Sequence, residues 1–100
     1  MNTIIKEENN DLVAYFEGRL DTTAASQTAK DVMPLNDCIG HNIILDCTQL
    51  EYISSSGLRL FLGVLKNAKP KGSTVTVTGL NDDLKQVFDE IGFTQLFNIQ

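Results

Sequence analysis

The sequence has few basic residues relative to its acidic ones. Among 100 residues, 8 are Lys or Arg and 13 are Asp or Glu, which gives a net charge of −5. Proteins that bind nucleic acid or an anionic membrane surface normally present a basic patch. We therefore expect neither of these partners, and a basic or neutral protein partner fits the charge better.

Residues that bind metals or activate nucleophiles are also scarce. Cys38 and Cys47 lack the C-x-x-C spacing, and His41 is the single histidine. A zinc site or a Cys–His pair would need residues from a second chain. We therefore expect no metal and no cofactor, and we interpret both cysteines as small, reduced apolar residues of a cytoplasmic protein.

Long hydrophobic runs are missing as well. The densest apolar region, residues 58–65, is interrupted by Arg59 and Gly63 and is shorter than the roughly 20 residues that cross a bilayer. The first eight residues lack the basic and apolar segments of a signal peptide. Without repeats, linkers or low-complexity segments, the sequence predicts one soluble domain spanning residues 1–100, with no membrane insertion.

The sequence does contain an alternation of strand and helix patterns. Residues 3–7 and 12–17 are rich in β-branched and aromatic residues, and the turn residues between them predict a β-hairpin. Apolar patterns predict further strands at 43–45 and 73–78. Apolar residues at the 3.6-residue period predict helices that follow Asp21, Gly57 and Asn81 and end near Pro34, Lys69 and Gly92.

This order of elements predicts an α/β domain. We expect a mixed sheet of four to five strands, an N-terminal β-hairpin and about four flanking helices. Open sheets of this kind usually place function at the carboxyl ends of their parallel strands. Residues 18–23 and the serines at 54–56 both join a strand end to a helix start, so we expect the two loops to adjoin.

Three consecutive serines, Ser54, Ser55 and Ser56, stand at the start of a predicted helix. The free N–H groups of a first helical turn attract hydroxyl oxygens and anions. One interpretation is that Ser54 or Ser55 is an N-cap worth about 1 kcal/mol and that Ser56 is an ordinary first-turn residue. The other is that a hydroxyl here is phosphorylated as a switch. Asp21 likewise is either a helix cap or a polar neighbour of this switch.

Four motifs follow one another in a fixed order along the chain. They are Gly18-Arg19-Leu20-Asp21, Leu45-Asp46, Ser55-Ser56-Gly57-Leu58, and Val87-Phe88 with Ile91-Gly92-Phe93. In this combination and order they resemble the STAS domain family of anti-sigma factor antagonists. The resemblance implies a regulatory protein-binding module that sequesters a serine kinase, which is also an anti-sigma factor. It also implies that serine phosphorylation ends the interaction and that a phosphatase restores it.

Carried onto this chain, the resemblance implies that Ser56 is the phosphoacceptor. The switch loop would include Ser54, Ser55 and Gly57, and the neighbouring loop would include Asp21 and Thr22. We interpret Gly57 as leaving the backbone and the hydroxyl open to a kinase. Ser54 stands where antagonists of this type commonly have an acidic residue, and this substitution removes a negative charge from the loop.

Leu60 and Val64 project away from the main apolar face of the helix that begins at Leu58. Exposed apolar side chains often mark a partner surface, so this pair could contact a partner. A neighbouring helix could equally well cover them. Both interpretations follow from the sequence.

The leading functional hypothesis is a phosphorylation-controlled antagonist, present as a monomer or weak dimer. The alternative is a non-phosphorylated STAS accessory subunit of a membrane lipid-transport or stress-signalling complex. An enzyme is the third class, but a serine hydrolase needs a base beside its nucleophile, and the sequence has no G-x-S-x-G motif. Only a close approach of His41 to Ser56 would revive that hypothesis.

Overall fold

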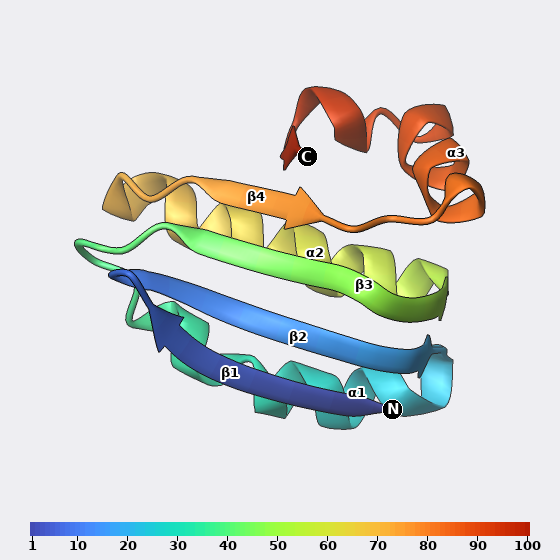
Figure 1. Ribbon diagram of the computed structural model, residues 1–100, viewed down its shortest axis with the longest axis horizontal. Helices are drawn as coiled ribbons and strands as arrows, with labels where there is room; N and C mark the ends of the chain where they lie inside the picture. Colours follow the sequence, from blue (N-terminus) through green and yellow to red (C-terminus); the bar gives the residue numbers. More distant parts are fainter.

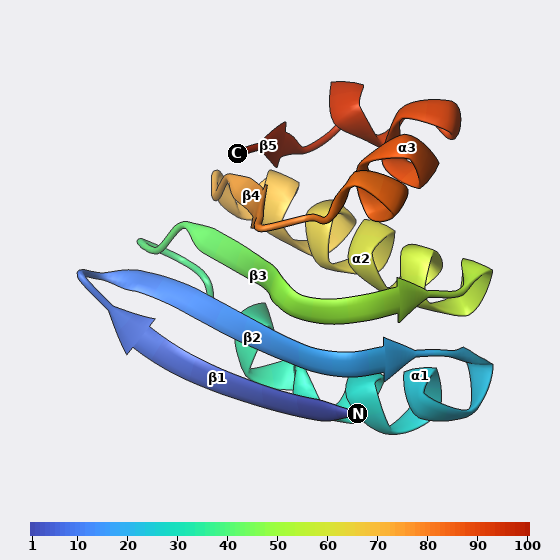
Figure 2. The same ribbon diagram turned by 45° about the vertical axis from the view of Figure 1, so that its right-hand side comes forward.

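The computed structural model describes residues 1–100, whose strands form one five-stranded mixed sheet in the order β1-β2-β3-β4-β5 (Figure 1). β1 pairs antiparallel with β2, and every other neighbouring pair is parallel. Figure 2 shows the short β5 beside β4. The predicted hairpin and mixed sheet are confirmed. The strands are β1 (Asn2–Glu8), β2 (Asp11–Leu20), β3 (Ile43–Ile53), β4 (Val75–Thr78) and β5 (Asn98–Ile99).

The strand β3 is longer than the sequence predicted. It continues past residue 45 to Ile53 because its second half pairs with the end of β2. Register shifts along this pairing break the period of two, so Leu50 and Ile53 are both buried although they are three residues apart. An irregular apolar pattern of this kind does not look like a strand in the sequence.

Three α-helices accompany the sheet, where about four helices were expected. Figure 1 shows α1 and α2 behind the sheet, and α3 lies at its β4 side. The other helical segments are 3-10 helices of three or four residues, two of which contain a proline in their first turn. None of the helices has the length and apolar character needed to cross a membrane. The α-helices are α1 (Thr22–Asp31), α2 (Ser55–Ala68) and α3 (Asp82–Glu90).

Each α-helix begins with a polar residue whose side-chain oxygen accepts a hydrogen bond from the backbone N–H three residues later. Such caps satisfy one of the N–H groups that have no partner within the helix. Ser54, and not Ser55, therefore caps α2. The bonds are Ala24 to Asp21 at 2.8 Å, Gly57 to Ser54 at 3.2 Å and Leu84 to Asn81 at 2.8 Å.

All five phenylalanines of the chain form one cluster in the core. Neighbouring ring centroids lie between 5.2 and 6.4 Å apart, in tilted or edge-to-face geometries. The cluster connects β2 and α2 with α3 and the segment that follows it, so it fixes the last fifth of the chain to the sheet. Its members are Phe16, Phe61, Phe88, Phe93 and Phe97.

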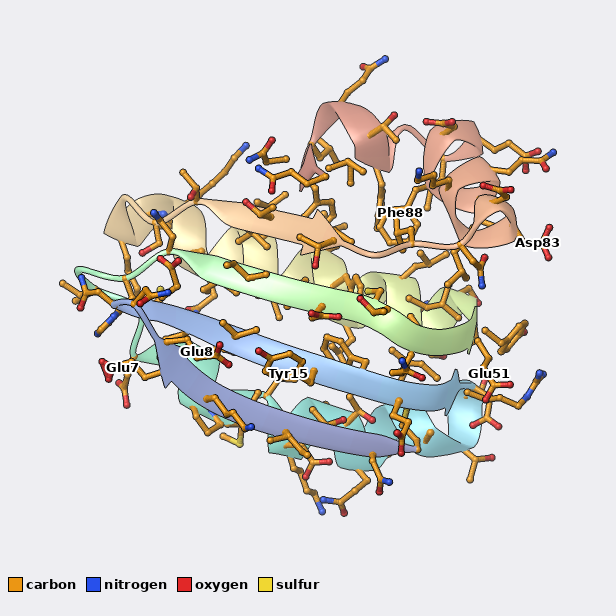
Figure 3. The ribbon with its side chains drawn as sticks, viewed as in Figure 1. Glu7, Glu8, Tyr15, Glu51, Asp83 and Phe88 are labelled. Carbon is orange, nitrogen blue, oxygen red and sulfur yellow. The ribbon has the colours of Figure 1, made fainter.

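The second face of the sheet is not covered by a helix, and it carries polar and apolar side chains together (Figure 3). Tyr15 lies on this face and donates a hydrogen bond to the Glu8 carboxylate, which raises the pKa of Tyr15 above its ordinary value. The Lys6 ammonium lies 5.7 Å from the centre of the Tyr15 ring. Ile4 on the edge strand remains 54% exposed.

Gly79, which follows β4, is pressed against the backbone of β3. A Cβ atom at this position would lie 2.8 Å from the Thr48 nitrogen and 2.9 Å from its Cα. The φ angle of Gly79 is 75°, in the left-handed region that side chains rarely adopt. The turn out of β4 therefore requires glycine for both reasons.

We expect Gly79→Ala to lower the free energy of unfolding by about 3 kcal/mol, because backbone strain and a backbone clash add. Gly72→Ala is the matched control: Gly72 has a φ angle of 74°, but a Cβ there meets nothing within 4 Å. The control should cost only about 1 kcal/mol. Urea denaturation of both variants measures the difference, and equal losses would contradict the close approach to Thr48.

Removing the cap of α2 provides a second test of the fold. Ser54→Ala should lower the stability by about 1 kcal/mol, which corresponds to a Tm lower by about 4–8 °C in a domain of this size. Ser55→Ala should stay within about 0.5 kcal/mol of the wild type, because Ser55 is exposed. A larger loss for Ser55→Ala would mean that the cap is misassigned. Differential scanning calorimetry gives both values.

Candidate functional site

The loops that follow β2 and β3 lie side by side, as predicted. The two strands run parallel and stay paired up to Leu20 and Ile53. Beyond that pair, the Ser54 N–H donates a hydrogen bond of 2.9 Å to the Leu20 carbonyl. The starts of α1 and α2 therefore meet at the carboxyl edge of the sheet, at the right of Figure 1.

Gly57 fixes how closely α2 approaches this edge. Gly57 is buried, and a Cβ atom there would lie 2.8 Å from both Leu20 Cγ and Ile53 Cγ1. The sequence interpretation that Gly57 leaves space for a kinase is therefore wrong. The space is filled by two core side chains, and glycine is needed because the helix start packs directly on the two strand ends.

The three serines have different environments. Ser54 is 8% exposed and its hydroxyl caps the helix, whereas Ser55 is exposed and has no such role. Ser56 is half-buried, and its Oγ accepts a hydrogen bond of 3.4 Å from Arg59 Nη2. Since the N–H groups of Ser55 and Ser56 belong to the first turn of α2, they have no acceptor within the helix. An anion on either hydroxyl would meet the positive end of the helix dipole.

The neighbouring loop contributes a carboxylate and an exposed hydroxyl. Asp21 caps α1 through its bond to the Ala24 N–H, so the helix-cap interpretation of Asp21 is confirmed. It directly follows Leu20, whose carbonyl accepts the Ser54 N–H. Thr22 is exposed at the first position of α1. The loop thus places one negative charge near the switch loop.

A stacked pair at the same edge was not predicted from the sequence. The Arg19 guanidinium lies 4.4 Å from the centre of the Tyr52 ring, across the last residues of β2 and β3. Such cation–π pairs hold an arginine in place without a carboxylate. Arg19 belongs to the motif that carries the family resemblance, but only the parallel pairing of the strands brings Tyr52 opposite to it.

A cavity of about 400 Å³ lies between α1 and α2, and Ser56 and Arg59 belong to its lining. Leu60 and Val64 line it too, facing Ala25 of α1. Val64 is 8% exposed and Leu60 is half-buried. Of the two expectations for this pair, cover by a neighbouring helix therefore holds for Val64. Together, Leu60 and Val64 form one wall of the groove between α1 and α2 and not an exposed patch.

The other groups considered for chemistry lie elsewhere. His41 hydrogen-bonds to the Asn10 carbonyl beside the β-hairpin turn, at the opposite end of β3 from Ser56. The eleven residues of β3 lie between these two ends, so the two side chains do not form a catalytic pair. Burial raises the pKa of Cys47 far above its ordinary value and keeps the thiol protonated. No three Cys, His, Asp or Glu side chains are grouped to hold a metal ion.

Comparison with known proteins identifies relatives over the whole fold. The anti-sigma-B factor antagonist of Bacillus subtilis strain 168 is 25% identical over 99 residues, covering 99% of this chain and 90% of the relative. The anti-sigma-B factor antagonist of Listeria monocytogenes is 27% identical over 97 residues, covering 96% of this chain and 85% of the relative.

Solved structures share the architecture at lower identity. An anti-sigma-factor antagonist (STAS) domain protein from Planctomyces limnophilus superposes with a TM-score of 0.89 at 16% identity, over 98% of this chain and 87% of the other. The Bacillus cell fate determinant SpoIIAA in its phosphorylated form gives a TM-score of 0.74 at 18% identity, over 99% and 91%. The STAS domain family model matches residues 2–100. The chain therefore belongs to the STAS domain family.

Proposed function

We propose that this protein is an anti-sigma factor antagonist controlled by phosphorylation of Ser56. The unphosphorylated protein would bind a serine kinase that also acts as an anti-sigma factor, and phosphorylation would end the complex. The observation that carries the proposal is the half-buried Ser56 hydroxyl in the first turn of α2, at the edge where two loops meet. The curated relatives named above, both anti-sigma-B factor antagonists, support this function.

The electrostatics of the edge explain how phosphate would act. Phosphorylation adds roughly −1.5 to −2 charge and three acceptor oxygens. Within the domain, the first-turn N–H groups and the helix dipole stabilise that charge, so the fold need not change. At an interface, the same charge must lose its water next to the half-buried Asp21 loop, and this penalty falls on partner binding.

The choice among the serines follows from their environments. Ser54 is poorly placed to be phosphorylated, because its hydroxyl is buried and caps the helix. Ser55 is exposed, so it is the serine that competes with Ser56 as the site of phosphorylation. Ser56 is favoured because it lies on the cavity between α1 and α2 and directly precedes Gly57, as the family resemblance requires.

The cellular setting belongs to the same proposal. A phosphatase would restore the unphosphorylated form, and the protein would act in the cytoplasm as a monomer or weak dimer. It would serve as a binding module without enzymatic activity. Asp21, Thr22 and the groove wall formed by Leu60 and Val64 would contribute to the contact surface.

A second candidate is a STAS accessory subunit that binds its partner constitutively. The neutral, buried Ser54 favours it, because antagonists of this type commonly have an acidic residue there and Ser54 instead serves as a cap. In that case Ser56 would not be phosphorylated and would serve only as a residue of the first turn of α2. The two candidates differ in whether a charge at position 56 changes binding.

We expect Ser56→Asp to weaken binding of the captured kinase at least tenfold, since about 1.4 kcal/mol of desolvation and repulsion suffices. Tm and circular dichroism should remain close to wild type, because the first turn of α2 tolerates a negative charge. The measurement is affinity capture from a lysate of the source organism, followed by titration calorimetry with the purified kinase. Ser56→Ala is the control and should bind like wild type. Equal affinities for Ser56→Asp and Ser56→Ala would favour the accessory-subunit function.

We also expect incubation with that kinase and ATP to add one phosphate, at Ser56. Tandem mass spectrometry of the proteolysed product locates the modified serine. The Ser56→Ala variant should remain unmodified, while Ser54→Ala should still accept phosphate. A phosphate found on Ser55 instead would show that the assignment is shifted by one residue.

A further inference from the structure

We propose that Arg59 holds the phosphate on Ser56 against the first turn of α2, as a positioning residue. The inference rests on the proposed phosphorylation of Ser56, and it assigns that modified site a partner within the same chain. Arg59 Nη2 already contacts Ser56 Oγ at 3.4 Å in the unmodified protein. Residues three positions apart on a helix are surface neighbours, so this contact needs no rearrangement of the backbone.

The guanidinium of Arg59 has unused hydrogen-bonding capacity. Arginine carries five N–H donors, and the contact with the Ser56 hydroxyl uses one of them. A phosphate on Oγ presents three acceptor oxygens beyond the hydroxyl position, which suits the planar fork of a guanidinium. The long hydrogen bond of 3.4 Å from a charged guanidinium to a neutral hydroxyl would thus become a pair of opposite charges.

No carboxylate on the same helix competes for Arg59. Residues Ser55–Ala68 include no Asp or Glu, so the helix offers no acidic partner three or four positions away. The cavity beside Ser56 and Arg59 is also lined without any acidic residue, and α1 presents small and apolar side chains such as Ala25 and Ala29 there. A phosphate on Ser56 would be the one anion on this wall.

The consequence is a phosphate satisfied by its own domain. Two first-turn N–H groups and Arg59 would surround it, so its charge is partly neutralised before any partner arrives. Because a nearby cation favours the dianion, Arg59 should lower the second pKa of the phosphoserine from its usual value near 6. Lysine at this position would supply the positive charge but not the planar, multiply donating guanidinium, so it would lower the phosphoserine pKa by a smaller amount.

The test uses the full chain with phosphoserine incorporated at position 56 during translation, so it does not depend on the natural kinase. A ³¹P NMR titration should give a phosphoserine pKa about 0.5 unit higher in Arg59→Gln than in the wild type, with Arg59→Lys in between. Lys66→Gln is the matched control. It removes the same charge from α2, but at a position ten residues beyond Ser56, about 15 Å along the helix.

An unchanged pKa in Arg59→Gln, or an equal rise in Lys66→Gln, would overturn the assignment of Arg59. Phosphorylation should also raise Tm more in the wild type than in Arg59→Gln, while the two unmodified proteins melt within about 2 °C of each other. Failure of the natural kinase to modify Ser56 would contradict the proposed function instead, and it would leave this titration unaffected.

Discussion

The parallel pairing of β2 and β3 up to their last residues is the constraint on which the site depends. Because both strands end at Leu20 and Ile53, both following helices start at one edge of the sheet. The bond from the Ser54 N–H to the Leu20 carbonyl then extends the pairing into the loops. Gly57 completes the arrangement by allowing α2 to rest directly on the two strand ends.

Local sequence patterns predicted the elements whose cause is local. The hairpin follows from Asn9 and Asn10, whose positive φ angles of 51° and 69° asparagine tolerates well. The caps at Asp21 and Asn81 depend only on a polar side chain and the N–H three residues later. The order of the four motifs supported the family resemblance. That resemblance selected Ser56 among the three serines, a choice that the local patterns alone left open.

The features that sequence reasoning missed depend on distant parts of the chain. Whether Val64 is exposed depends on where α1 lies, and the tight fit around Gly57 depends on a side chain from β2. The second half of β3 was missed because register shifts disturb its alternation. Arg59 could have been noticed three positions after Ser56, but its freedom from carboxylates becomes clear only when the walls of the cavity are known.

The bond between Ser54 and Leu20 has a consequence for how a switch at this edge would be read. It ties the start of α2 to the last residue of β2, which also pairs with Ile53 of β3, so the backbone of this edge has little freedom to change shape. In the proposed mechanism, a partner would therefore distinguish the two forms by the phosphate and its charge, and not by a change in backbone shape. Mobile ions screen such a charge over about 8 Å at physiological ionic strength. The contrast between the two forms would then vary with the ionic strength of the surrounding solution.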